Sequence, residues 1–245
     1  ATTLGTAGGG GTCSSTIPCF YVRSADVTNL VRNAGAGSYV TGRVPATQGN
    51  SENNSNTAGW TLAVVYQNGS LPSRNLTVYV GAEVTNATIQ TTATVSGFCT
   101  PTSGIQSGRL LVSALEGDPQ ITGDQMQFGP TAGTLVPLAG SNNPVGNFFA
   151  SQINGALGLR DTSGSFGSSN STPGSGTSGA RQGYDITSIE VSSTLTTAQT
   201  SAVARGTSTG DQYVINALGL QIQVGAPVFL VPVKAVDKPV AVIGD

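Results

Sequence analysis

The chain of 245 residues has no histidine and few charged residues of any kind. Without histidine it lacks the most common general base, and the Ser-His and Cys-His catalytic arrangements are excluded within one chain. Charged residues make up 9% of the sequence, against about 25% in an average soluble domain. The formal net charge of −2 gives no basic surface for nucleic acid. We therefore predict a protein that is not an enzyme and that binds no nucleic acid.

Long apolar runs are also missing, so the sequence predicts no helix that spans a membrane. Cysteine occurs only at Cys13, Cys19 and Cys99, a spacing that does not form a zinc site. Cys13 can form a disulfide with Cys19, or either can pair with Cys99. Disulfides persist in oxidising compartments, and the chain begins with small residues, as mature secreted proteins do. We expect a secreted protein, extracellular or at a cell surface.

Alternation of apolar and polar residues is the main pattern that is present, and it indicates β-strands. It is clearest in residues 58–80, where two strands flank a turn at Asn68-Gly69, and we expect the only tryptophan, Trp60, to lie in the centre of a sheet. In the last predicted strand, Leu218, Leu220, Ile222 and Val224 share one apolar face. Helical spacing occurs only in residues 24–33, with Ser24 as the expected N-cap. The other predicted strands are 19–24, 37–44, 85–98, 108–116, 125–128, 134–138, 147–154, 201–207 and 213–224.

These elements predict an all-β fold, a jelly-roll-like sandwich of two antiparallel sheets with long Gly/Ser/Thr-rich loops and at most one short helix. Residues 13–225 form the single domain. Residues 1–12, which include four consecutive glycines, form a flexible or donor arm. Residues 226–245 form an apolar strand or arm, because three prolines exclude a central strand. Its predicted assembly positions are Val228, Leu230, Val231, Val233 and Val236.

Acidic residues gather between residues 116 and 124, around two glycines. Glu116, Asp118 and Asp124, joined by Asp211 from another loop, are oxygen ligands of the kind that Ca²⁺ takes six to eight at a time. The spacing is not that of an EF-hand, and the alternative is that these acids cap local backbone turns. Ca²⁺ is therefore the candidate cofactor, with Glu116, Asp118, Asp124 and Asp211 as its candidate ligands.

Seven short stretches resemble the globular domain at the head of large secreted bacterial cell-surface, adhesin-like proteins, which usually stands ahead of tandem immunoglobulin-like repeats. The resemblance implies a secreted β-sandwich with a role in adhesion or in the cell envelope. This chain lacks the repeats, and its glycine-rich arm stands where the family has an opening strand. The stretches are ADVTNLV (25–31), AGWTLAVVY (58–66), LPSRNLTVY (71–79), LEGDPQITGD (115–124), NPVGNFF (143–149), RQGYDI (181–186) and TGDQY (209–213).

A sandwich that lacks one strand leaves unpaired N–H and C=O groups, which a neighbouring subunit can fill by strand addition. We therefore predict a structural subunit of an extracellular filament or surface assembly whose partners are copies of itself. The tail can instead fold back onto its own sheet and give a monomer. The alternative function is a calcium-dependent adhesin or carbohydrate-binding module with glycan partners, for which Tyr39, Tyr184 and Tyr213 are candidate exposed contacts.

Overall fold

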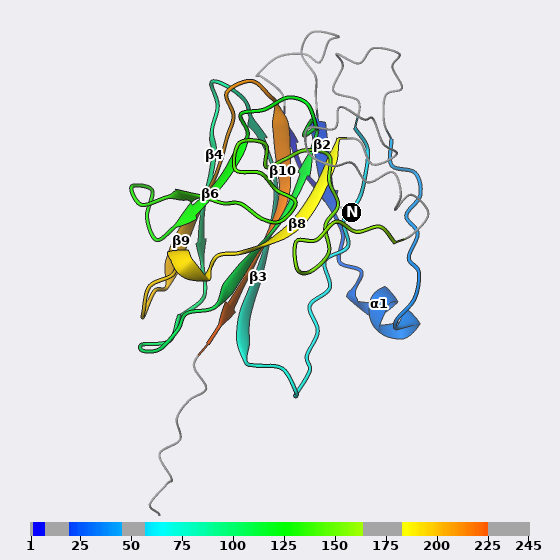
Figure 1. Ribbon diagram of the computed structural model, residues 1–245. Coiled ribbons are helices and arrows are strands. Elements are labelled where there is room, and N and C mark those ends of the chain that lie inside the picture. Colours follow the sequence, from blue (N-terminus) through cyan, green and yellow to red (C-terminus); the bar gives the residue numbers. More distant parts are fainter. Residues whose placement is uncertain (1, 8–19, 46–56, 164–182, 225–245) are drawn as a thin grey trace, which may run out of the picture.

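The structure, a computed structural model, describes residues 2–7, 20–45, 57–163 and 183–224. Two antiparallel four-stranded sheets face each other, which confirms the predicted all-β sandwich (Figure 1). The first sheet has the order β3 (Arg74–Thr85), β10 (Tyr213–Gln223), β5 (Gly108–Leu115), β8 (Tyr184–Glu190). The second has the order β4 (Thr91–Ser96), β9 (Ser201–Thr207), β6 (Gln125–Gly129), β7 (Val136–Pro137).

Three smaller elements accompany the sandwich. Strand β1 (Thr2–Ala7) pairs antiparallel with β2 (Phe20–Ser24) in a separate two-stranded sheet. Helix α1 (Thr28–Ala34) buries none of its residues, and a 3₁₀ turn covers Ser192–Thr194. The predicted Ser24 N-cap is wrong, because the helix begins at Thr28 and Val27 is in the N-cap position. The Asp26 carboxylate accepts the Thr28 N–H at 2.8 Å. No helix in the described part of the chain is long and apolar enough to cross a membrane.

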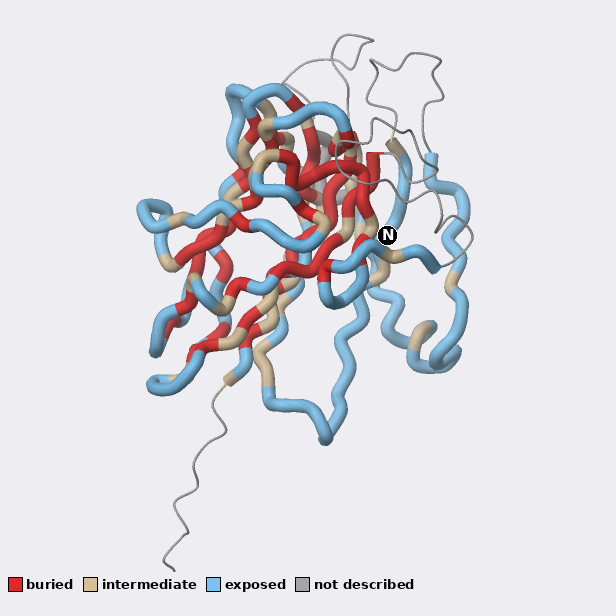
Figure 2. Tube along the Cα trace, in the orientation of Figure 1, coloured by how far each residue is buried: buried red, intermediate tan, exposed pale blue. Residues whose placement is uncertain are grey.

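The core lies between the two sheets, where inward-facing side chains of both pack together. Figure 2 shows the buried residues along the strands of both sheets. Successive side chains of a β-strand point to opposite faces of the sheet, so every second residue of each strand contributes to the core. Full burial of one such side chain stabilises the fold by about 1.5–3 kcal/mol. The largest fully buried apolar residues are Tyr213, Phe128, Phe148, Phe149, Leu110, Met126, Ile222, Val95, Val191 and Val214.

Strand β10 changes its inward side partway along. Its register shifts between Ile215 and Ala217 against both neighbouring strands. Before the shift Tyr213 and Ile215 face the core, and after it Leu218, Leu220 and Ile222 do. The predicted common buried face of Leu218, Leu220 and Ile222 is confirmed, and the bulge places Tyr213 in the core as well.

Residues 58–66 do not form the predicted central strand. They run as extended chain over the outer face of the first sheet, where Thr61 Oγ1 lies 2.9 Å from Ser113 Oγ and 2.8 Å from the Tyr184 hydroxyl. Trp60 is 43% exposed and Tyr66 68% exposed, and nearly the whole segment is coloured as exposed in Figure 2. Alternation specifies an extended conformation but not a partner, and no described strand pairs with this segment.

Two more predicted strands are wrong for related reasons. Residues 37–44 have no strand structure in the part of the chain described. Residues 147–154 form a bent loop with two isolated bridges, a parallel one from Ile153 to Ile186 of β8 and an antiparallel one from Asn154 to Arg160. This loop nevertheless packs both Phe148 and Phe149 into the core, with ring centroids 5.0 Å apart.

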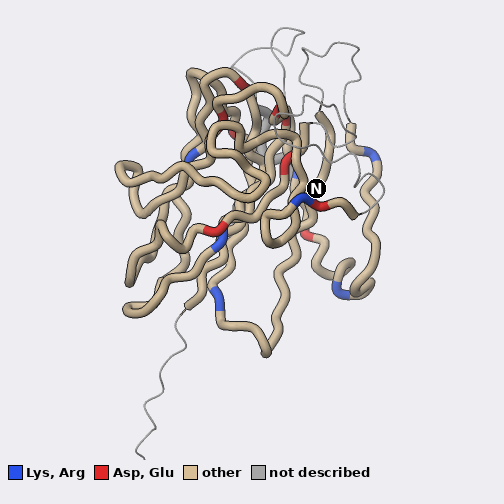
Figure 3. Tube along the Cα trace, viewed as in Figure 1, with Lys and Arg blue, Asp and Glu red and all other residues tan. Residues whose placement is uncertain are grey.

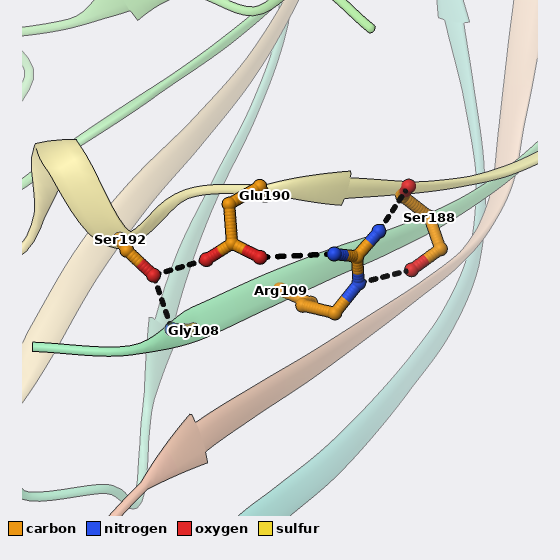
Figure 4. Close-up of polar contacts among 5 residues, drawn as sticks. All are labelled: Gly108, Arg109, Ser188, Glu190 and Ser192. Atoms are coloured by element: carbon orange, nitrogen blue, oxygen red, sulfur yellow. Dashed lines mark hydrogen bonds and ion pairs between the residues drawn. The ribbon is translucent and has the colours of Figure 1, made fainter. Parts of the chain in front are cut away.

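A polar cluster on the outer face fastens β5 to β8 (Figure 4). The Arg109 guanidinium contacts Glu190 at 2.9 Å and donates to the Ser188 hydroxyl at 2.9 Å and carbonyl at 2.8 Å. The Ser192 hydroxyl accepts the Gly108 N–H at 2.9 Å and donates to Glu190. Because Glu190 is exposed, this pair contributes no more than about 1 kcal/mol.

Candidate functional site

The candidate site lies at one end of the sandwich, where two loops cross between the sheets. Residues 116–124 leave β5 in the first sheet and enter β6 in the second, and residues 208–212 leave β9 in the second and enter β10 in the first. Acidic positions gather at this end, the upper end in Figure 3. The β5–β6 and β9–β10 crossovers are therefore side by side although they lie about 90 residues apart in sequence, and the Asp118 N–H joins them through a hydrogen bond to Asp211.

Backbone geometry fixes the first crossover. Glu116 has φ +78°, in the left-handed region, and its N–H donates to the Gly183 carbonyl at 2.6 Å. Gly117 sits so tightly that a Cβ there would lie 2.5 Å from both the Phe149 carbonyl oxygen and an Asp185 carboxylate oxygen. Gly123 has φ +117°, and a Cβ there would meet Thr209 of the second crossover. The two glycines let the crossover lie directly against its neighbours.

Three of the four predicted ligands come together. One carboxylate oxygen each from Glu116, Asp118 and Asp211 lies within 4.8 Å of the other two. Asp211 is buried and well oriented, since its Oδ1 accepts the Gln212 N–H at 2.7 Å and its Oδ2 accepts the Asp118 N–H at 3.2 Å. Burial raises the pKa of Asp211 to about 7, and the charge of Asp118 adds to the shift. Burial also raises the pKa of Asp118.

Asp124, the fourth predicted ligand, lies beside this group rather than within it. It is fully buried, and its Oδ1 accepts a hydrogen bond from the Ser208 hydroxyl at 3.3 Å. Its Oδ2 is buried and has no hydrogen-bond partner in the structure. Burial raises the pKa of Asp124 to about 9, and the charges of Asp211 and Asp185 raise it further. Asp124 is therefore protonated at neutral pH in the protein as it stands.

Asp185 is a member of the cluster that the sequence analysis missed. It lies near the start of β8 opposite Ala114, on the inward side of the sheet, and it is 3% exposed. Its Oδ1 accepts the Gln152 N–H at 2.9 Å, and burial raises the pKa of its carboxyl to about 7. The sequence predicts no strand here, and a carboxylate on the inward side of a strand is the sequence signal that would have pointed to it.

Asn147 closes the site from the loop before β8. Its Nδ2 donates to the Pro119 carbonyl at 3.1 Å, so the side chain is anchored to the first crossover. Its Oδ1 is buried and has no hydrogen-bond partner in the structure, and the residue is only 4% exposed. The site thus combines several carboxylates with unsatisfied oxygen acceptors, and the charges that raise the pKa values of Asp124, Asp185 and Asp211 are those of other aspartates.

The remaining predicted residues lie elsewhere. Cys99 is an exposed free thiol, and the other disulfide candidates, Cys13 and Cys19, lie outside the described residues. So do the five assembly positions Val228, Leu230, Val231, Val233 and Val236. The prediction of exposed contacts is wrong for Tyr184 and Tyr213, which are 6% and 0% exposed because each packs into a hydrophobic cluster. Tyr39, by contrast, is not buried.

Comparison with known proteins adds no relative. No protein-family model, curated protein or solved structure matches the chain.

Proposed function

We propose that this chain is a secreted structural subunit of an extracellular assembly and that copies join by β-strand addition at the edge of β3. The observation that carries the proposal is an open edge next to exposed apolar side chains. Strand β3 is twelve residues long and lies at the end of its sheet, and no described strand pairs along its other side. A long unpaired edge is a template for another strand.

The other edge strands are less suited as acceptors. Residues 152–154 cover the outer edge of β8, where the Ile186 N–H donates to the Gln152 carbonyl at 2.9 Å and the Ile186 carbonyl accepts the Asn154 N–H at 2.7 Å. Strand β7 has two residues, and β4 has six, four of them Thr or Ser. Among the described strands, β3 therefore offers the longest edge without a hydrogen-bonded neighbour, although β1 and β2 lie close to it.

The outer face beside this edge is apolar. Leu76, Val78 and Val80 of β3 are 44–49% exposed, and Leu111 of β5 is 42% exposed. Toward the other end of the same face, Phe20 of β2 packs with Leu115, Tyr184 and Val214 and is buried. Exposed valine and leucine side chains in a row favour a partner that covers them.

The candidate donor is the apolar segment 226–245, which lies outside the described residues. The described chain leads to it from a suitable place, because the Val224 N–H donates to the Ser73 carbonyl at 3.1 Å, immediately before β3 begins. Its alternating valines and leucine match the apolar row in character. A second copy of the chain is therefore the partner we propose.

The test compares the full chain with a chain truncated after residue 225. We expect the full chain to form oligomers or fibres by light scattering and electron microscopy, and the truncated chain to be monomeric. A synthetic peptide of residues 226–245 should bind the truncated chain, and Val78→Lys should weaken that binding by roughly tenfold or more. Leu157→Lys, in an exposed loop near β8, is the control. Equal assembly with and without the tail would refute the proposal.

A calcium-dependent adhesin or carbohydrate-binding module is the second candidate, and the exposure of Trp60 and Tyr66 favours it. Both rings are accessible on the segment that crosses the outer face, and such rings provide flat contact surfaces with a polar handle. A glycan array probed with and without chelator tests it. Binding that disappears in Trp60→Ala would support this candidate, and an array without signal would count against it.

A further inference from the structure

We propose that the two crossovers form a binding site for one Ca²⁺ ion, with Glu116, Asp118 and Asp211 as carboxylate ligands and the buried Asp124 beside them. The site does not depend on strand addition, since it lies in the loops that join the two sheets rather than at the edge of β3. Either proposal can fail while the other holds.

The spacing of the carboxylates fits one ion. Oxygens bound to Ca²⁺ lie 2.3–2.6 Å from it, so two of them are at most about 5 Å apart. The oxygens of Glu116, Asp118 and Asp211 lie within 4.8 Å of one another. Each comes from one of the two crossovers, so an ion at this point contacts both.

A second, independent observation is the unsatisfied oxygen of Asp124. The residue is fully buried, and the Ser208 hydroxyl links its Oδ1 to the Asp211 N–H, yet its Oδ2 has no hydrogen-bond partner in the structure. A buried carboxyl oxygen without a partner destabilises the fold by roughly 1–3 kcal/mol or more. Asn147 Oδ1, buried and also without a partner, lies on the loop that is bonded to the first crossover. A cation supplies the partner that these acceptors lack.

The donor set selects the metal. Every candidate ligand is a hard oxygen, and the chain has no histidine for a softer metal such as Zn²⁺ or Cu²⁺. Mg²⁺ requires a near-octahedral shell and keeps several waters, whereas Ca²⁺ accepts six to eight oxygens in flexible geometry. A cluster of three carboxylates on two loops therefore suits Ca²⁺ best.

The ion would act as a cross-link between the sheets. One crossover joins β5 to β6 and the other joins β9 to β10, so each connects the first sheet with the second. Without an ion the acids repel one another, and the loops are joined by the Asp118–Asp211 and Ser208–Asp124 hydrogen bonds and by the close approach of Gly123 to Thr209. Binding thus reinforces the end of the sandwich that carries most of its buried charge.

The first experiment uses the full chain after treatment with chelator. Calorimetric titration with CaCl₂ should show one site per chain with a Kd of about 10⁻⁴–10⁻³ M or lower, the range of extracellular modules. At about one hundred times Kd the Tm should rise by roughly 5–10 °C. Titration with MgCl₂ should give at least about tenfold weaker binding. The highest Ca²⁺ concentration should be 10 mM, roughly ten times the upper end of that Kd range. Absence of both heat and a rise in Tm at this concentration would overturn the proposal.

Variants then separate a cation site from turn acids that only hold backbone. Asp118→Asn and Asp211→Asn should weaken Ca²⁺ binding by roughly tenfold or more, whereas Glu83→Gln, at an exposed position of β3, should leave it unchanged. Asp124→Asn gives the sharpest readout, because it removes a buried acid and keeps its shape. We expect a higher Tm without Ca²⁺ and a smaller rise with it. Unchanged affinity in all three site variants would overturn the proposal.

Discussion

The acidic end of the sandwich and the outer face of β3 reverse the usual arrangement of polar and apolar residues. At the acidic end, Asp124, Asp185 and Asp211 are 0–4% exposed, whereas on β3 Leu76, Val78 and Val80 are 44–49% exposed. The difference follows from topology. Two crossovers and the loop before β8 close over the acids, while an edge strand has a neighbour on one side only. In these two regions, the position of a residue in the fold determines its burial more than its polarity does.

An added methyl group should therefore change the free energy of unfolding by very different amounts in the two regions. Gly117→Ala puts a Cβ 2.5 Å from the Phe149 carbonyl oxygen and from Asp185, so we expect a loss of about 3 kcal/mol or more in the free energy of unfolding. Gly81→Ala on β3 meets nothing within 4 Å and should change it by less than about 0.5 kcal/mol. Urea unfolding of both variants measures the contrast, which would disappear if the acidic end were as loosely packed as the edge.

The next largest effect is a dependence on pH that comes from the acidic end alone. Unfolding returns the carboxyl pKa values to about 3.8, whereas in the folded protein they are about 9 for Asp124 and about 7 for Asp185 and Asp211. Between these values the folded protein binds more protons than the unfolded chain, so stability is highest near the lower limit and falls as pH rises. In chelator, Tm should fall by roughly 5–10 °C between pH 5 and pH 9.

Asp124→Asn is the control for this dependence, because it removes the carboxyl with the highest pKa. The variant should lose a large part of the slope of Tm against pH, and saturating Ca²⁺ should do the same in the original chain. Variants of the apolar face such as Val78→Lys should keep the slope. A flat pH profile of the original chain in chelator would mean that the buried acids are solvated in solution.

The smallest effect is expected on the exposed segment. Trp60→Ala should change the free energy of unfolding by less than about 1 kcal/mol, because the ring is 43% exposed. Phe128→Ala, at a fully buried position of β6, should lower it by about 3–5 kcal/mol. Acrylamide should quench the fluorescence of the single tryptophan readily in the native protein. A loss of several kcal/mol in Trp60→Ala would place this ring in a core, as its pattern in the sequence suggests.

Much of the sandwich could be predicted from two-residue periodicity. Strands β5, β9 and β10 lie within about two residues of their predicted limits, because each has a clear inward and outward face. Residues 58–66 show why the rest could not. Both of their faces are largely apolar, which is typical of a strand buried on both sides, yet pairing depends on neighbours that come from distant parts of the chain.

The site was partly predictable for a similar reason. Glu116, Asp118 and Asp124 are close in sequence, so their proximity in space needed only a turn, whereas Asp211 was joined to them on the basis of its loop composition. Asp185 lies more than 60 residues from that turn and 26 from Asp211, and only the pairing of β8 with β5 brings it there. Pairing of this kind is set by register across the sheet, which local patterns do not report.

Tyr79 limits how another strand could join the proposed acceptor edge of β3. From β3 its hydroxyl donates to the Ser96 carbonyl and accepts the Ser96 N–H, both at 2.9 Å, so one phenol replaces a missing backbone partner at the end of β4. Tyr79 thereby joins the first sheet to the second at this point. A strand added at β3 would therefore extend the first sheet and would not insert between the two sheets. Such a joint depends on main-chain groups, so it should tolerate changes in the donor's side chains better than the insertion of a proline.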